Sequence, residues 1–368
     1  MKIDRISVYH LEYSLAQGTF SMSGGKTASG QDSTIVRIET DSGLIGWGET
    51  CPFSPMYMPA FAGGARAAIH EFGPALLGCD PRQLDVLEIT MDRMLPGHLY
   101  AKMAIDMACW DILGLETGMS VSALLGGRFS EQLSVYTGVS IGEPEMMRDQ
   151  AEQVRDLGYR SIQLKVGEGF EVDINRIDAC LDVLPNMDTV IVDANGGWNR
   201  HDAARVLSQY SEADILIEQP CPTIESCAIL RGRSRLPFVL DESLDSFSAL
   251  VRANSLGAMD AANLKLSRFG GMTRVRRMRD ICSEWAVAVT IEDSGGGDIV
   301  SAAMTHMSAS TRPGLMLSSY LASDMVNEQI AEGAPRVVNG TVRVPTGPGL
   351  GVRVDEAALG EPAFELRA

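Results

Sequence analysis

Residues 190–195 read Val190-Ile191-Val192-Asp193-Ala194-Asn195, a short apolar run that ends in an acidic residue. Similar runs end at Lys165, Glu218, Asp241 and Lys265, so successive run ends lie 28, 25, 23 and 24 residues apart. Each interval has about the length of one strand–helix unit. Eight such runs occur, at 135–139, 162–166, 190–193, 215–218, 238–241, 262–266, 287–291 and 315–317. The repeat predicts the α/β class and a parallel (β/α)8 TIM barrel.

An open doubly wound sheet is the alternative arrangement for such a repeat. Sheets of that kind more often have five or six strands, and they carry a glycine-rich phosphate turn after the first strand. The glycine run Gly295-Gly296-Gly297 follows the seventh apolar run instead. The barrel is therefore the favoured arrangement.

The first 130 residues have a different pattern. Stretches 3–9, 33–40 and 44–49 are strand-like, whereas 63–78, 83–94 and 99–116 are helix-like. The glycine- and serine-rich segment 14–32 has the length of a lid or of a disordered loop. The tail at 337–354 has strand-like pieces again, and we expect it to return to the first domain.

Composition and charge exclude several classes of protein. A content of 45% hydrophobic and 21% charged residues excludes a disordered chain, a coiled coil and a collagen-like repeat. The net charge of −17 argues against a nucleic-acid-binding protein, which needs a cationic surface. No segment has the ~18 uninterrupted apolar residues of a membrane span, and the N-terminus lacks signal-peptide features. With seven cysteines and no C-x-x-C pair, we expect buried thiols in a cytoplasmic protein.

Three consecutive predicted strand ends carry the acids Asp193, Glu218 and Asp241. In a parallel barrel the side chains at these ends converge around one axis. Three carboxylates suit Mg²⁺, which keeps its other positions for water or substrate, whereas without a cation they would repel one another. The alternative is that each acid caps the helix that follows it. The sequence therefore predicts Mg²⁺ as the cofactor.

Two lysines flank the three acids along the chain. Lys165 ends the second run and Lys265 the sixth, four strands apart, so they should face each other across the barrel. A substrate bound between them would expose one face to each amine. We expect Mg²⁺ and the second ammonium to lower the pKa of the lysine that acts as a base. The alternative is two solvated lysines at loop starts.

The whole chain resembles the enolase superfamily, in its muconate-lactonizing-enzyme-like branch. The motifs that carry this resemblance are Gly43-Leu44-Ile45-Gly46-Trp47-Gly48-Glu49, Ala104-Ile105-Asp106-Met107-Ala108-Cys109-Trp110-Asp111, Asp193-Ala194-Asn195, Glu218-Gln219-Pro220, Asp241-Glu242-Ser243, Lys265-Leu266 and Pro345-Thr346-Gly347-Pro348-Gly349-Leu350-Gly351. The resemblance implies a modified barrel at 131–324 under an α+β capping domain at 1–130, completed by 325–368. It also implies that loops 14–32 and 51–61 cover the substrate.

The chain departs from the family pattern on two strands. Many members carry Lys-x-Lys on the second strand, where this chain has Gln163-Leu164-Lys165. Dipeptide epimerases hold an ammonium group with Asp-x-Asp on the last strand, where Leu315-Met316-Leu317-Ser318 stands here. These features resemble the subgroup that acts on proline derivatives, hydroxyproline betaine 2-epimerases and cis-3-hydroxy-L-proline dehydratases. The resemblance implies substrate contacts from Tyr57, Gln163, Asn195, Asp293 and Gly295.

The nature of the ring nitrogen separates the two activities. The betaine epimerases surround a quaternary ammonium with tryptophan, the best cation–π partner, but Gly295 and the segment 317–321 offer none here. The resemblance therefore favours Mg²⁺-dependent dehydration of cis-3-hydroxy-L-proline to Δ1-pyrroline-2-carboxylate, with Lys265 as base and Lys165 as acid. The alternative is a 2-epimerase of proline derivatives such as 4-hydroxyproline betaine, which would use the same lysines.

Two further classes stay open from the residues alone. A Schiff-base aldolase would use a barrel lysine as a nucleophile, and a non-catalytic barrel would only bind a ligand. In each case we expect a small-molecule ligand, no nucleic-acid or membrane partner, and a homo-oligomer.

Overall fold

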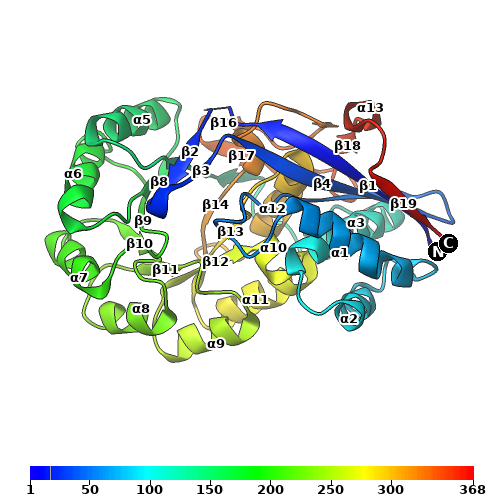
Figure 1. Ribbon diagram of the computed structural model, residues 1–368, viewed down its shortest axis with the longest axis horizontal. Helices are drawn as coiled ribbons and strands as arrows, with labels where there is room; N and C mark the ends of the chain where they lie inside the picture. The colour runs from blue at the N-terminus through cyan, green and yellow to red at the C-terminus, as the bar shows by residue number, and fades with distance from the viewer. Residues whose placement is uncertain (17) are drawn as a thin grey trace.

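The eight apolar runs form eight consecutive parallel strands of a barrel (Figure 1). The computed structural model describes residues 1–16 and 18–368. The strands are β7 (Tyr136–Val139), β8 (Ser161–Lys165), β9 (Thr189–Asp193), β10 (Leu216–Glu218), β11 (Phe238–Leu240), β12 (Ala261–Lys265), β13 (Ala288–Glu292) and β14 (Met316–Ser319). A parallel bridge between Val135 and Ser319 links the two edges of this sheet. The predicted barrel is confirmed, and the open sheet was the wrong alternative.

Helices follow the barrel strands and cover their outer side. They are α5 (Pro144–Asp156), α6 (Phe170–Leu181), α7 (Arg200–Gln209), α8 (Ile224–Arg231), α9 (Phe247–Ser255), α10 (Leu266–Phe269), α11 (Met272–Glu284) and α12 (Asp298–Ala309). The side chains of Asn199, Thr223 and Ser246 cap α7, α8 and α9 by accepting hydrogen bonds from free backbone N–H groups. Within the described part of the chain, no helix combines the length and apolar character needed to span a membrane.

The capping domain is built from both ends of the chain, as expected. A four-stranded antiparallel sheet has the order β19 (Phe364–Arg367), β1 (Ile3–Ser14), β4 (Gly30–Thr40) and β5 (Ile45–Thr50). Because β19 pairs with β1, the two termini lie side by side (Figure 1). Helices α1 (Ala62–Phe72), α2 (Leu84–Met94) and α3 (Leu99–Thr117) complete the cap. The exact residue bounds of the two domains stay a prediction.

The remaining elements are short. They are η1 (Ser23–Gly25), η2 (Gly73–Leu76), α4 (Val121–Leu124), β6 (Gln132–Ser134), η3 (Ala322–Asp324), β15 (Ala331–Glu332), β16 (Val337–Val338), β17 (Thr341–Arg343), β18 (Arg353–Val354) and α13 (Glu356–Leu359). Within the segment 14–32, β2 (Phe20–Met22) and β3 (Lys26–Ala28) pair as a hairpin, so of the two expectations for this segment, a lid or a disordered loop, disorder is wrong for residues 20–28. Burial of Phe20 and Met22 accounts for this order. Gln17 of that segment lies outside the described residues.

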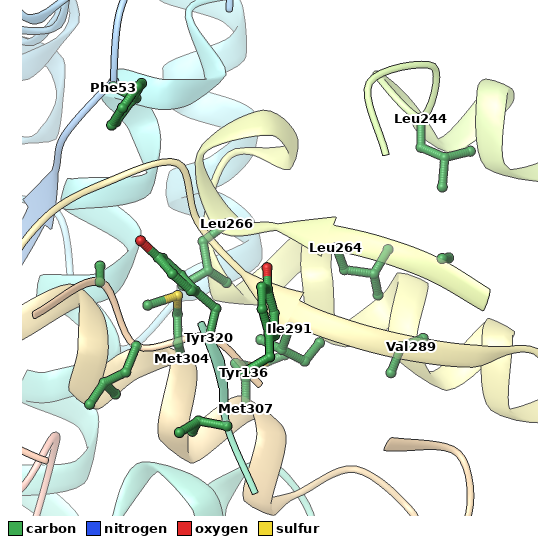
Figure 2. Packing of buried hydrophobic residues seen from close by; sticks show 14 of the residues in the cluster. Phe53, Tyr136, Leu244, Leu264, Leu266, Val289, Ile291, Met304, Met307 and Tyr320 are labelled. Atoms are coloured by element: carbon green, nitrogen blue, oxygen red, sulfur yellow. The ribbon is translucent and has the colours of Figure 1, made fainter. Parts of the chain in front are cut away.

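Close packing of β5 on α3 explains two glycines of the 43–49 motif. A Cβ atom at Gly48 would lie 1.8 Å from the carbonyl oxygen of Ala104, and one at Gly46 would lie 2.3 Å from that of Ala108. Any side chain there would push the strand off the helix. Further into the molecule, α12 packs between β5 of the cap and the barrel, and Figure 2 shows its Met304 and Met307 near Ile291 of β13.

Asp111 of α3 joins three parts of the fold. Its buried carboxylate accepts hydrogen bonds from the backbone N–H of Trp47 at 3.0 Å and of Leu350 at 2.8 Å. Burial raises the pKa of Asp111 to about 7, although the two N–H groups oppose this shift. The carboxylate therefore links β5, α3 and the C-terminal tail, and it titrates near neutral pH.

We expect Asp111→Asn to change how stability depends on pH. Between about pH 4, near the pKa of Asp111 in the unfolded chain, and the folded-state pKa of about 7, the native state keeps the Asp111 proton while the unfolded chain loses it. The free energy of unfolding should therefore fall as pH rises through that window. The Asp111→Asn variant should lack this decline. It should also lose about 2 kcal/mol at the acidic end, because the new amide N–H₂ group faces a backbone donor. Urea denaturation across the window measures both effects.

The matched control is Asp182→Asn, which alters an exposed carboxylate. It should change neither the stability nor the pH slope of the protein. An Asp111→Asn variant with the wild-type slope would contradict the assignment.

Candidate active site

The five predicted catalytic and metal-binding side chains lie on adjacent strands at one mouth of the barrel. Lys165, Asp193, Glu218 and Lys265 end β8, β9, β10 and β12, and Asp241 directly follows β11. In the parallel register Lys165 lies beside Asp193, and Asp193 lies beside Glu218. All five side chains are buried. The C-terminal ends of these strands therefore bring the predicted group together.

Each lysine is held by a carboxylate on the next strand. The Nζ atom of Lys165 lies 2.5 Å from Oδ2 of Asp193. The Nζ atom of Lys265 lies 2.8 Å from Oδ2 of Asp241 and 2.9 Å from Oε1 of Glu292. The two lysines thus stand four strands apart, as predicted, and each belongs to its own ion pair.

The pKa shifts of the lysines differ from the expected direction. Burial lowers the pKa of Lys165, but the charges of Asp193 and Glu218 outweigh burial and raise it. In the same way, Asp241 and Glu292 overcome burial and raise the pKa of Lys265 well above its ordinary value. The neighbouring carboxylates therefore have a stronger effect than the second ammonium, and both amines are protonated in this arrangement.

Glu218 lies between the other two acids. Its carboxylate accepts hydrogen bonds from Gln163 Nε2 at 2.7 Å and from Asn263 Nδ2 at 2.9 Å. Burial, followed by the charges of Asp193 and Asp241, raises the pKa of Glu218 well above its ordinary value. The three carboxylates therefore repel one another, and a bound cation would relieve this repulsion.

The donor atoms around the acids fit a hydrated Mg²⁺ ion. Three buried oxygens have no hydrogen-bond partner within the described residues: Asn195 Oδ1, Glu242 Oε2 and Asn263 Oδ1. Their amide or carboxylate groups contact the acids or one another, so the site has more oxygen acceptors than donors.

As they stand, however, the side chains do not form a ready metal-binding group. In the part of the chain that the structure describes, no three acid, histidine or cysteine side chains are arranged to hold a metal. The oxygens of Asp193 and Asp241 face Lys165, Lys265 and Arg268 instead. Assignment of the three acids as ligands stays a prediction that the donor chemistry supports.

A pocket lies over this group of charges. The barrel contributes its two lysines, and the cap contributes Phe20, Met22, Phe53 and Tyr57. The hydroxyl of Tyr57 donates to Oδ2 of Asp241 at 2.9 Å. Both cap segments that were expected to cover the substrate therefore supply walls of the pocket.

Three of the five predicted substrate contacts line this pocket: Tyr57, Gln163 and Asp293. The other two do not, which differs from the prediction. The amide of Asn195 donates to Asp193 and Glu242, both at 2.9 Å, and is used inside the charge network. Gly295 packs against Gln31 of the cap, where a Cβ atom would lie 2.5 Å from Oε1.

Sequence reasoning missed Glu292, Tyr136 and Tyr320. Glu292 ends β13 and pairs with Lys265, while the hydroxyl of Tyr136 donates to its carboxylate. The ring centroids of Tyr136 and Tyr320 lie 5.6 Å apart, and Figure 2 shows the two rings side by side. Glu292 follows an apolar run as the other site residues do, so this signal could have identified it. The tyrosines carried no comparable signal.

The pocket has an aromatic wall without tryptophan. Within the described residues, the lining side chains include phenylalanines and tyrosines but no tryptophan. Phe20 and Phe53 meet edge to face, with centroids 6.1 Å apart. Trp110 and Trp198 instead donate structural hydrogen bonds to Thr273 and Asp173. From the segment 317–321, the lining residue is Tyr320, a tyrosine and not a tryptophan.

Two family models match the chain. Residues 6–126 match the N-terminal domain of mandelate racemase / muconate lactonizing enzyme, and residues 146–358 match the enolase C-terminal domain-like family. Curated relatives include a cis-3-hydroxy-L-proline dehydratase from Roseibium aggregatum, 44% identical over 98% of this chain and 99% of that protein. An N-succinyl-L-Arg/Lys racemase from Bacillus cereus is 29% identical over 98% of each chain.

Solved structures agree with this assignment. A putative mandelate racemase/muconate lactonizing enzyme from Roseovarius nubinhibens, complexed with magnesium, has a TM-score of 0.95 and 35% identity over the full length of both chains. The similarity covers the cap, the barrel and the order of the strands that carry the charged group. The chain therefore belongs to the enolase superfamily and is an enzyme of that superfamily.

Proposed function

We propose that the protein is a Mg²⁺-dependent dehydratase that removes water from cis-3-hydroxy-L-proline and yields Δ1-pyrroline-2-carboxylate. The observation that carries the proposal is the placement of Lys165 and Lys265 four strands apart, at the floor of one pocket. The 44% identity to the Roseibium aggregatum dehydratase supports the choice of substrate. A homo-oligomer stays a prediction.

The stereochemistry of the substrate requires an acid and a base on opposite faces. In cis-3-hydroxy-L-proline the hydroxyl and the carboxylate share one ring face, so the α-proton lies on the other. Lys265 would take the α-proton, and Lys165 would give a proton to the hydroxyl, which leaves as water. The resulting enamine would tautomerise to the cyclic imine, so the net change is the loss of one water.

The ion pairs determine the protonation state of each lysine before this step. The carboxylates of Asp193 and Glu218 raise the pKa of Lys165 in spite of burial, so this amine carries the proton that a general acid must have. Lys265 becomes a base only once Asp241 and Glu292 no longer hold its proton. A bound Mg²⁺ would supply positive charge for the substrate carboxylate as the α-proton leaves; Asp193, Glu218 and Asp241 would hold it.

The pocket favours a secondary amine over a betaine. A protonated ring nitrogen has two N–H donors, and Glu292 offers a buried carboxylate on the pocket wall. A quaternary nitrogen has no N–H and depends on aromatic faces, where tyrosine and phenylalanine attract cations less strongly than tryptophan does.

A 2-epimerase of proline derivatives, such as 4-hydroxyproline betaine, is the second candidate. Tyr136 and Tyr320 favour it, because paired rings on the wall can attract a cation. The same two lysines would then return the proton to the opposite face. A Schiff-base aldolase has less support, because both amines are held protonated and a nucleophilic lysine must be neutral. A non-catalytic barrel does not agree with membership of an enzyme superfamily.

Proton NMR in D₂O with Mg²⁺ separates the two activities. With cis-3-hydroxy-L-proline, we expect the signal of the proton on the hydroxyl-bearing carbon to disappear as water is lost. Deuterium entering the α-position of an intact ring, with no loss of water from the wild-type protein, would support the epimerase instead. No change with any proline derivative would contradict both activities, but it would leave the fold assignment unaffected.

Single substitutions assign the two lysines. Lys265→Ala should lower both α-deuterium exchange and dehydration by about 10²- to 10⁴-fold, because the base is lost. Lys165→Ala should retain α-deuterium exchange and lose dehydration, because only the acid is lost. Lys2→Ala, at an exposed lysine, is the control and should leave both rates unchanged. The opposite pattern would reverse the two roles.

Mg²⁺ should stabilise the protein through the three acids. At a hundred times its Kd, the ion should raise the free energy of unfolding by about 2.7 kcal/mol. Asp193→Asn and Glu218→Gln should abolish this increase, whereas Glu292→Gln, which removes a pocket carboxylate outside the trio, should retain it. Thermal denaturation with Mg²⁺ or with EDTA provides the measurement. Equal stabilisation of the Glu218→Gln variant would contradict the ligand assignment.

A further inference from the structure

The loop after the seventh barrel strand receives a carboxylate from the capping domain. In (β/α)8 barrels this loop and a nearby helix N-terminus often bind an anionic group of a ligand, because free backbone N–H groups point there. Here residues 295–297 lead into α12, and Glu49 at the end of β5 lies against them. The chain's own carboxylate thus takes the place that a ligand anion takes in other barrels.

Four neutral donors hold the Glu49 carboxylate, which is fully buried. Two come from the barrel: the N–H of Gly297 at 2.8 Å and the N–H of Val300 at 3.0 Å. Two come from the cap: the hydroxyls of Tyr13 and Ser33, both at 2.9 Å. The two barrel donors lie at the start of the twelve-residue helix α12, where the helix dipole favours a negative charge.

Two glycines of the loop, Gly295 and Gly297, pack directly against side chains of the cap. A Cβ atom at Gly297 would lie 2.3 Å from the Tyr13 hydroxyl, and one at Gly295 would lie 2.5 Å from Oε1 of Gln31. The same Gln31 oxygen accepts a hydrogen bond from the N–H of Gly296 at 2.9 Å. The cap therefore occupies the space that side chains of this loop would need.

Glu49 connects the segments that supply two walls of the pocket. The chain after Glu49 continues into Phe53 and Tyr57, which line the pocket from the cap. The loop that Glu49 holds begins directly after Asp293 and Ser294, which line the pocket from the barrel. Glu49 itself does not line the pocket.

We propose that Glu49 is a positioning residue for substrate binding, which fixes the cap-derived wall of the pocket against the wall formed by Asp293 and Ser294. The proposal rests on the proposed function for the identity of the substrate. It adds to that function a determinant of affinity that lies outside the pocket. The two lysines, on β8 and β12, are not held by this contact.

Glu49→Gln tests the proposal, because the new N–H₂ group faces a donor and breaks one barrel contact at nearly constant volume. We expect KM to rise about tenfold while kcat changes by less than about threefold, since the walls shift and the lysines do not. Hydrogen–deuterium exchange of residues 294–300 should become faster. A purely structural role would lower the melting temperature and leave KM unchanged, and that result would overturn the proposal.

Two further variants keep the test decisive. Ser33→Ala removes a donor inside the cap, so it should lower stability without changing KM or exchange in the loop; an equal rise in KM would overturn the proposal. If Glu49→Gln does not fold, Gln31→Met removes the acceptor for Gly296 and should give the same rise in KM and the same faster exchange. A wild-type protein that converts no proline derivative would overturn the proposed function, whereas the exchange measurement would still decide the role of Glu49.

Discussion

The mouth of the barrel buries acids and bases together, and their mutual pairing is the constraint on which the rest of the structure depends. Four carboxylates, on β9 to β11 and on β13, share this space with two lysines and Arg268. Buried charges are costly unless they are paired and hydrogen-bonded. The strand ends must therefore lie at one level, so that each lysine reaches the acid of the next strand. An open sheet would not bring the ends of β8 and β12, with Lys165 and Lys265, to one pocket.

This arrangement also explains why the lysines are protonated here. Acids at hydrogen-bond distance hold a proton on each amine more strongly than burial removes it. A lysine at such a site can act as a base only after the carboxylates that pair with it are neutralised or drawn to another cation. The spare oxygen acceptors around Glu218 suggest where that change comes from, since they suit a hydrated cation.

The cap has a second role besides lining the pocket. Its strands β4 and β5 hold the loop after β13 through Gln31 and Glu49, while the chain beyond β5 supplies Phe53 and Tyr57 to the pocket. The pocket is thus assembled from two domains, and its dimensions depend on how these domains dock. Within the cap, the buried carboxylate of Asp111 holds β5, α3 and the C-terminal tail together by accepting hydrogen bonds from Trp47 and Leu350.

Local patterns in the sequence determined the eight strands, the group of Lys165, the three acids and Lys265, and the strand-and-helix composition of the cap. These features repeat at the period of one strand–helix unit, and parallel strands place their C-terminal ends at one edge, so spacing alone is informative. Only the tertiary structure decided that Asn195 faces the charge network, that Gly295 packs against Gln31, and that residues 20–28 form a hairpin. It also decided that Tyr136, Tyr320 and Glu292 share a wall of the pocket. The physical reason is that these contacts join residues far apart in the chain, and a one-dimensional pattern has no signal for the distance between them.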